Sequence, residues 1–148
     1  MDKQTRSRMM SGIKGANTKP ELLLRRALHA RGFRYKIHDR KLPGRPDIVL
    51  PKWRVVIEVR GCFWHRHEGC PKANTPATNA AFWREKFLSN IARDRMNADA
   101  LLASGWRVLI VWECAIGRIL QKNVVDEVTD FVTDGMQTGV RLHEIGAV

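Results

Sequence analysis

The stretch Val55-Val-Ile-Glu-Val-Arg-Gly-Cys-Phe-Trp-His-Arg-His-Glu-Gly-Cys70 joins an apolar run to a cluster of reactive side chains. Residues 53–59 are rich in β-branched amino acids and predict a buried strand. Residues 60–79 contain Gly, Pro, Cys and His and predict a loop. A buried strand that leads acids, imidazoles, thiols and aromatic rings into one loop indicates a functional site at the end of a sheet.

A second apolar run lies just upstream and begins with a carboxylate, in Gly44-Arg-Pro-Asp47-Ile-Val-Leu50. Pro51-Lys52 predicts a turn between the two runs. If the runs pair as antiparallel strands, Asp47 begins one strand and Glu58 stands near the end of the other, so the two carboxylates meet. We therefore expect paired carboxylates at one end of the sheet.

The remaining chain predicts helices and strands around this pair. Thr18-Lys-Pro-Glu21 matches a capping box and begins a helix expected over 19–31. The other expected elements are strands at 33–37 and 106–112, a long helix at 80–104 and a last helix at 117–133. This order predicts an α/β fold with a mixed central sheet flanked by helices. We expect a basic arm, residues 1–17, ahead of a single domain, residues 18–148, whose tail after about 134 carries no interpretable motif.

The chain is strongly basic. Its 148 residues contain 26 Lys and Arg against 15 Asp and Glu, a net charge of +11, which favours a polyanionic partner such as nucleic acid. No apolar run approaches a membrane span, and no secretory signal opens the chain. The three cysteines are an odd number in a chain without an export signal, which favours metal ligation or free thiols over disulfides.

The paired carboxylates suit Mg²⁺, which takes oxygen ligands and few protein carboxylates. Asp47 and Glu58 are candidate ligands, and the backbone carbonyl of Val59 is a third. Arg60 projects to the same strand face as Glu58 and could hold a phosphate. Hydrolysis of a phosphodiester usually needs a cation that stabilises charge on the scissile phosphate and activates water. Solvent-exposed acids at strand ends are the alternative interpretation.

The loop also has the spacing of a tetrahedral zinc site. Cys62, His67 and Cys70 offer two thiolates and an imidazole, and Cys114 after the 106–112 strand is the remaining cysteine. Such a site would be structural and would tie the loop to the sheet. The alternative is a set of buried thiols beside a surface histidine.

His65 is spare if His67 binds the metal, and it could act as a general base oriented by a carboxylate such as Asp94. An ordinary surface ion pair of Asp94 with its arginine neighbours is the alternative. Phe63 and Trp64, joined by Trp83, could stack on or wedge between bases, or fold back onto the core.

In combination, the motifs resemble the very-short-patch-repair (Vsr) DNA mismatch endonucleases from about Arg6 to Gly117. The anchors are Leu42-Pro-Gly-Arg-Pro-Asp47, Gly61-Cys-Phe-Trp-His65, Phe82-Trp83, Arg93-Asp94-Arg95 and Gly105-Trp-Arg-Val-Leu-Ile-Val-Trp-Glu-Cys114. The resemblance implies a restriction-endonuclease-like core and a Mg²⁺-dependent enzyme that nicks one strand beside a T:G mismatch.

The resemblance also implies roles for single residues. Asp47 matches the metal-binding aspartate, His65 and Asp94 the catalytic pair, and Glu21 a helical glutamate near the site. The matches to structural zinc ligands are Cys62, His67, Cys70 and Cys114. The matches to intercalating side chains are Phe63, Trp64 and Trp83, with Met10 and Ile13 of the arm entering from the opposite groove.

The chain departs from the family pattern at three strand positions and in the loop. Val59 stands where threonine is usual, Glu58 where an apolar residue is usual, and Arg60 where histidine is usual. One extra residue lies between His67 and Cys70. Glu58 therefore becomes a candidate additional metal ligand, and the chain comes closer to the general Pro-Asp…Glu-x-Lys nuclease pattern.

These observations predict a monomeric enzyme of the bacterial cytoplasm, associated with the nucleoid, that acts on double-stranded DNA with Mg²⁺ and contains structural Zn²⁺. Mismatch-repair proteins are possible further partners. A site-specific nickase or restriction-type enzyme that needs no mismatch is the first alternative. A non-catalytic zinc-stabilised DNA-binding module and a zinc-stabilised protein-interaction domain are the others.

Overall fold

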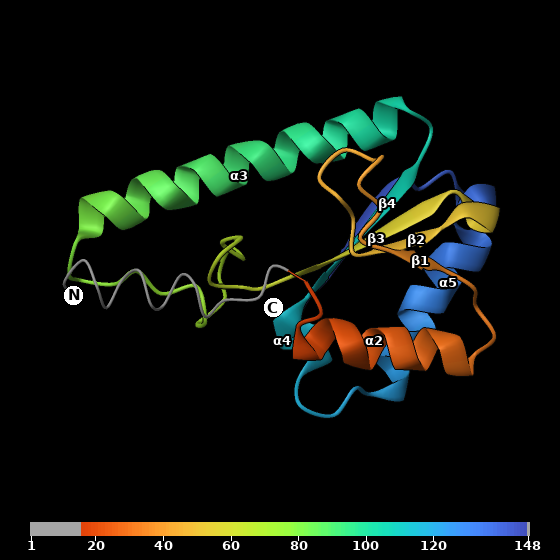
Figure 1. Ribbon diagram of the computed structural model, residues 1–148. Helices are drawn as coiled ribbons and strands as arrows, with labels where there is room; N and C mark the ends of the chain where they lie inside the picture. Colours follow the sequence, from red (N-terminus) through yellow and green to blue (C-terminus); the bar gives the residue numbers. More distant parts are fainter. Residues whose placement is uncertain (1–15, 148) are drawn as a thin grey trace.

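A five-stranded mixed sheet forms the centre of the computed structural model, which describes residues 16–147 (Figure 1). The strands lie in chain order: β1 (Lys36–Ile37), β2 (Ile48–Leu50), β3 (Val55–Arg60), β4 (Arg107–Trp112) and β5 (Leu142–Ile145). β1, β2 and β3 pair antiparallel, whereas β3, β4 and β5 pair parallel. The expected antiparallel pairing of the two apolar runs is confirmed.

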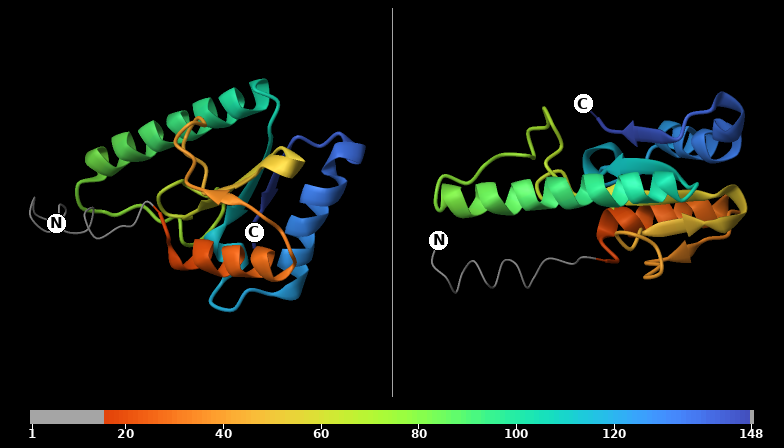
Figure 2. Two further views of the ribbon diagram at one scale, coloured as in Figure 1. Left: turned by 45° about the vertical axis from the view of Figure 1, so that its right-hand side comes forward. Right: turned by 90° about the horizontal axis from the view of Figure 1, so that it is seen from above.

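Helices cover both faces of this sheet. The helical segments are α2 (Lys19–Ala30), η1 (Pro51–Trp53), α3 (Ala80–Ala103), α4 (Glu113–Ile116) and α5 (Lys122–Thr138). Figures 1 and 2 show the long α3 on one side of the sheet, with α2 and α5 on the other. The expected α/β architecture is confirmed. No helix within residues 16–147 is both long and apolar enough to cross a membrane.

Alternate side chains of the strands build two separate cores. Ile57 and Leu109 face α2 and α5, where they pack with residues such as Leu28 and Val128. Val56 and Val108 face the other way and pack near Leu101 of α3. The second core continues into Cys62 and Cys70, so the reactive loop is anchored in packed apolar surface.

Several sequence predictions were wrong in detail. The last strand, β5, was missed because it lies at the edge of the sheet and three of its four residues are exposed or half-buried. The last helix begins at Lys122, since a short α4 and a turn at Gly117 precede it. The apolar pattern of the 80–104 segment also predicts that Ile91 faces the core, but this side chain is 45% exposed because the N-terminal half of α3 extends past the sheet (Figure 1).

The arm side chains expected to contact DNA, Met10 and Ile13, lie outside the described residues. The proposed boundary between the arm and the domain at residue 17 therefore remains a prediction.

Candidate active site and metal centre

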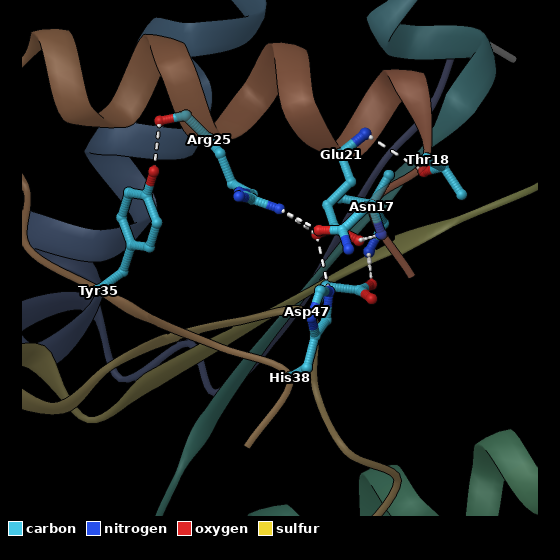
Figure 3. Close-up of polar contacts among 8 residues, drawn as sticks. Asn17, Thr18, Glu21, Arg25, Tyr35, His38 and Asp47 are labelled. Carbon is cyan, nitrogen blue, oxygen red and sulfur yellow. Dashed lines mark hydrogen bonds and ion pairs between the residues drawn. The ribbon is translucent and has the colours of Figure 1, made fainter. Parts of the chain in front are cut away.

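Glu21 occupies the first turn of α2 and is buried, with 1% of its surface exposed. The Thr18 hydroxyl accepts a hydrogen bond from the Glu21 backbone N–H, as a capping residue does. The second hydrogen bond of the expected capping box, from the Thr18 backbone N–H to the Glu21 carboxylate, is not formed. The Glu21 carboxylate instead accepts from the backbone N–H of Asn17 at 3.2 Å and from Arg25 at 3.0 Å (Figure 3). The helix N-terminus therefore presents Glu21 to the end of the sheet.

Asp47 lies immediately before β2, and the register of β2 with β3 places it opposite Glu58. The backbone N–H of Val59 donates to Asp47 Oδ2 at 2.8 Å. Burial, followed by the negative charges of Glu21 and Glu58, raises the pKa of Asp47 to about 7. A divalent cation bound among these carboxylates would favour the charged form of Asp47.

His38 completes this group and was not identified from the sequence. Its backbone N–H donates to the Asp47 carbonyl at 3.2 Å, which extends the β1–β2 pairing. Its Nε2 lies 2.8 Å from Glu21 Oε2 (Figure 3). One ligand atom from each of Glu21, His38 and Asp47 can lie within 4.8 Å of the others. The available signal was the position of His38 directly after the 33–37 strand, which pairs with the strand that Asp47 opens.

Glu58 and Arg60 form an ion pair on the neighbouring strand. Arg60 donates through Nε at 3.0 Å and through Nη2 at 2.7 Å, both to Glu58 Oε2. The Arg60 side chain is only 10% exposed, so this pair is well shielded from water. Glu58 stands close enough to Asp47 to affect its pKa, but it is held by Arg60. Its role as a metal ligand remains a prediction.

The structure brings His65 and Asp94 together although they come from the loop and from α3. His65 Nδ1 lies 2.6 Å from Asp94 Oδ2. Asn90 of α3 donates to the Trp64 carbonyl at 3.0 Å and so fixes the loop to the same helix. The pair can therefore be held in place by α3 before any substrate binds.

A cavity of about 140 Å³ joins these groups, lined by Asp47, Glu58, Arg60, His65 and Asp94 among others. Gly44 borders it with a positive φ of 73°. A Cβ at Gly44 would lie 2.8 Å from Asn97 Nδ2, so glycine lets the Leu42–Pro46 turn approach α3. A second cavity of about 360 Å³ is lined by Glu21, Asp47, Val59 and His65 on the α2 side. Asp47 and His65 line both cavities.

The four candidate zinc ligands converge. Ligand atoms of Cys62, His67, Cys70 and Cys114 lie within 4.8 Å of one another. His67 Nδ1 is 3.6 Å from Cys62 Sγ and 3.4 Å from Cys114 Sγ, spacings that suit ligands around one tetrahedral ion with bonds of about 2.0–2.3 Å. Three thiols and one imidazole are a typical donor set for structural zinc. The residues therefore fit a metal centre.

The surroundings of this centre are preorganised. The His67 ring stacks on Trp112, with centroids 4.3 Å apart, and α4 begins where β4 ends, which places Cys114 beside the loop. Burial raises the pKa of the Cys62 thiol to about 12. The extra loop residue is accommodated by Gly69, whose φ of 76° most side chains would avoid.

The aromatic residues form a cluster. The Phe63 ring packs edge-on against Trp64, Trp83 and Phe87, with centroids 4.9, 5.7 and 5.2 Å away. Phe63 and Trp64 are half-buried, whereas Trp83 is completely buried and its indole Nε1 has no hydrogen-bond partner. In this conformation Trp83 therefore supports the other two rings instead of forming an exposed wedge.

The sequence comparisons agree with this geometry. A family model described as DNA mismatch endonuclease Vsr matches residues 1–72. The chain is 46% identical to DNA mismatch endonuclease Vsr of Escherichia coli, over 78% of this chain and 73% of the relative. It is 42% identical to the Type II nicking enzyme V.XorIIP of Xanthomonas oryzae pv. oryzae, over 76% of this chain and 82% of the relative.

A third relative, the Type II nicking enzyme V.NmeAIP of Neisseria meningitidis serogroup A, is 42% identical over 86% of this chain and 94% of its own. Among solved structures, the catalytic domain of the homing endonuclease I-Bth0305I matches with a TM-score of 0.51 and 19% identity, over 78% of this chain and 94% of that domain. That likeness supports the restriction-endonuclease-like core. With relatives this similar over most of their length, the chain belongs to the Vsr family of endodeoxyribonucleases.

Proposed function

We propose that this enzyme is a Mg²⁺-dependent DNA mismatch endonuclease that nicks one strand beside a T:G mispair. The observation that carries the proposal is the shared cavity in which Asp47, His65 and Asp94 meet beside the Phe63–Trp64 pair. A bound divalent cation supplies charge stabilisation at a scissile phosphate and a more acidic water. Asp47 and the Val59 carbonyl are the residues that would hold it, with Glu58 and Glu21 alongside.

His65 is suited to move the proton of the attacking water. Because Nδ1 faces Asp94, that nitrogen carries the proton and Nε2 remains free to accept another. Asp94 fixes the ring and stabilises the imidazolium that forms. Both residues touch the cavity that contains Asp47, so the base and the cation-binding carboxylate face the same space.

The charge distribution suits a DNA backbone. A net charge of +11 favours tight, salt-sensitive binding to phosphates, and Arg60 offers its guanidinium at the cavity. Phe63 and Trp64 would unstack a mispair, which costs less to distort than a matched pair. Met10 and Ile13 would enter from the other groove. The enzyme would act as a monomer at the bacterial nucleoid, with a structural Zn²⁺ and with mismatch-repair proteins as possible partners.

A nickase that requires no mismatch is the second candidate. Two of the relatives described above are named Type II nicking enzymes. The buried Glu58–Arg60 pair also gives this site a charge arrangement of its own. Both candidates nick DNA, so only the dependence on the mismatch separates them.

The first experiment compares the cleavage of two duplexes in the presence of Mg²⁺. The duplexes are identical except for one T:G mismatch, which lies in a sequence of the kind that a DNA methyltransferase recognises. We expect a nick only in the mismatched duplex, on the T strand. An Asp47→Asn variant serves as the control for contaminating nucleases. Equal cutting of matched and mismatched duplexes would contradict the mismatch requirement and support the nickase.

Glu58→Gln should slow cleavage by about 100-fold or more, because one charge-stabilising group typically contributes about 10²–10³ in rate. Single-turnover nicking measures the effect, and near-normal turnover would remove Glu58 from the site. Arg60→Gln and the double variant complete a cycle. If Glu58 only anchors Arg60, the double variant will cleave no more slowly than Arg60→Gln alone. We expect instead that the double variant cleaves more slowly than Arg60→Gln.

A further inference from the structure

His38 faces the same carboxylates as the proposed cation but has no part in the proposed mechanism. Its side chain is 13% exposed, and its Nε2 contacts Glu21 Oε2 at 2.8 Å. In the group formed by Glu21, His38 and Asp47, the ligand atoms all lie within 4.8 Å of one another. Around an octahedral ion with bonds of about 2.1 Å, adjacent ligands lie about 3 Å apart and opposite ones about 4.2 Å. The 4.8 Å bound exceeds the opposite-ligand distance by about 0.6 Å, so small shifts of these side chains would bring the three ligand atoms into one coordination shell.

The charges and the space around the group also suit a dication. Glu21 and Asp47 provide two carboxylates, and Arg25 is the cation that bonds to Glu21 at 3.0 Å. When both carboxylates are ionised, the set therefore retains a net negative charge even with Arg25 counted. Glu21 and Asp47 also line the 360 Å³ cavity, which gives an ion and its waters access from that side.

We propose that Glu21, His38 and Asp47 bind a single divalent ion and that the imidazole of His38 makes this site favour Mn²⁺ over Mg²⁺. Imidazole is a better ligand for transition metals, whereas Mg²⁺ prefers oxygen and keeps most of its waters. The proposal deepens the proposed function, because it rests on Asp47 holding the catalytic cation. It adds the imidazole of His38 to the carboxylates as a ligand, and with it a preference among ions.

The alternative is that His38 only positions Glu21 through their hydrogen bond. The two roles differ in what removal of the imidazole does. Loss of a nitrogen ligand lowers the affinity for Mn²⁺ much more than the affinity for Mg²⁺. Loss of an orienting hydrogen bond lowers both affinities alike. A comparison of the two ions therefore separates a ligand from a positioning residue.

The test titrates Mn²⁺ into zinc-loaded, full-length protein without DNA and measures free Mn²⁺ by electron paramagnetic resonance. Competition with Mg²⁺ gives the second affinity. His38→Gln should weaken Mn²⁺ binding by about tenfold or more, while Mg²⁺ affinity changes by less than about threefold. Because His38 has a φ of 48°, His38→Asn is measured as well, since Asn is among the non-glycine residues that adopt that backbone conformation most readily.

Two further variants locate the site. His143 also pairs with a carboxylate, Glu127 at 2.9 Å, but lies on β5, so His143→Gln should leave both affinities unchanged. Asp47→Asn should lower the affinity for both ions. Equal weakening of both ions in the His38 variants, or no change, would overturn the proposal, as would Mn²⁺ binding that survives Asp47→Asn. Binding is measured without cleavage, so an inactive wild-type enzyme that still shows the His38 effect would contradict the proposed function alone.

Discussion

Asp47→Asn is expected to lower the rate of strand nicking by about 10³-fold, the upper end of the effect of one preorganised charge-stabilising group. The neutral amide retains the shape of the side chain and can still accept from the Val59 N–H. It cannot offer a charged oxygen to a cation beside Glu21. Single-turnover nicking of a mismatched duplex, at saturating enzyme and several Mg²⁺ concentrations, measures the loss.

The stability of the same variant separates chemistry from folding. The pKa of Asp47 is raised to about 7 in the folded protein from an ordinary 3.8. Its contribution to the free energy of unfolding is therefore greatest below about pH 4 and is lost as the pH rises through about 7. Without divalent ions at pH 8, Asp47→Asn should melt at or above the wild-type temperature. An inactive variant that also melts lower would point to misfolding instead of a missing ligand.

Removal of the zinc proposed at Cys62, His67, Cys70 and Cys114 is expected to have the largest effect on stability. Structural zinc contributes roughly 10–16 kcal/mol in small zinc domains, and losing about 5 kcal/mol of this would lower the melting temperature of this chain by about 10–20 °C. The loop that carries His65 would lose its attachment to Cys114 of α4, directly after β4. Thermal melting with and without a strong chelator measures the change.

Single-ligand variants make the zinc test specific. Cys114→Ser should abolish bound zinc, seen by native mass spectrometry, and should melt as the chelated wild type does. His29→Gln is the matched control, because this exposed histidine on α2 lies outside the cluster. One zinc per chain in the control and none in Cys114→Ser is expected. A stable wild-type protein that contains no zinc would contradict a structural role.

Local patterns in the sequence were sufficient for much of this fold. β-branched runs around a Pro-Lys turn predicted the β2–β3 pair, and Thr18 and Pro20 predicted the start of α2. These signals are local because hydrogen bonding and side-chain alternation repeat within a few residues. β5 carried no such signal, because an edge strand buries little and needs only the neighbouring β4 to define it.

The sequence by itself determined which chemical groups are present: the thiols and imidazoles of the loop, Asp47 at a strand start, and the excess of positive charge. Only the tertiary structure decided which of them meet. His38 joins Glu21 and Asp47, Glu58 pairs with Arg60, and Trp83 is buried under Phe63 and Trp64. The reason is that strand register and helix packing set the distances between residues far apart in the chain. Those distances decide whether side chains can bind one ion or shift each other's pKa.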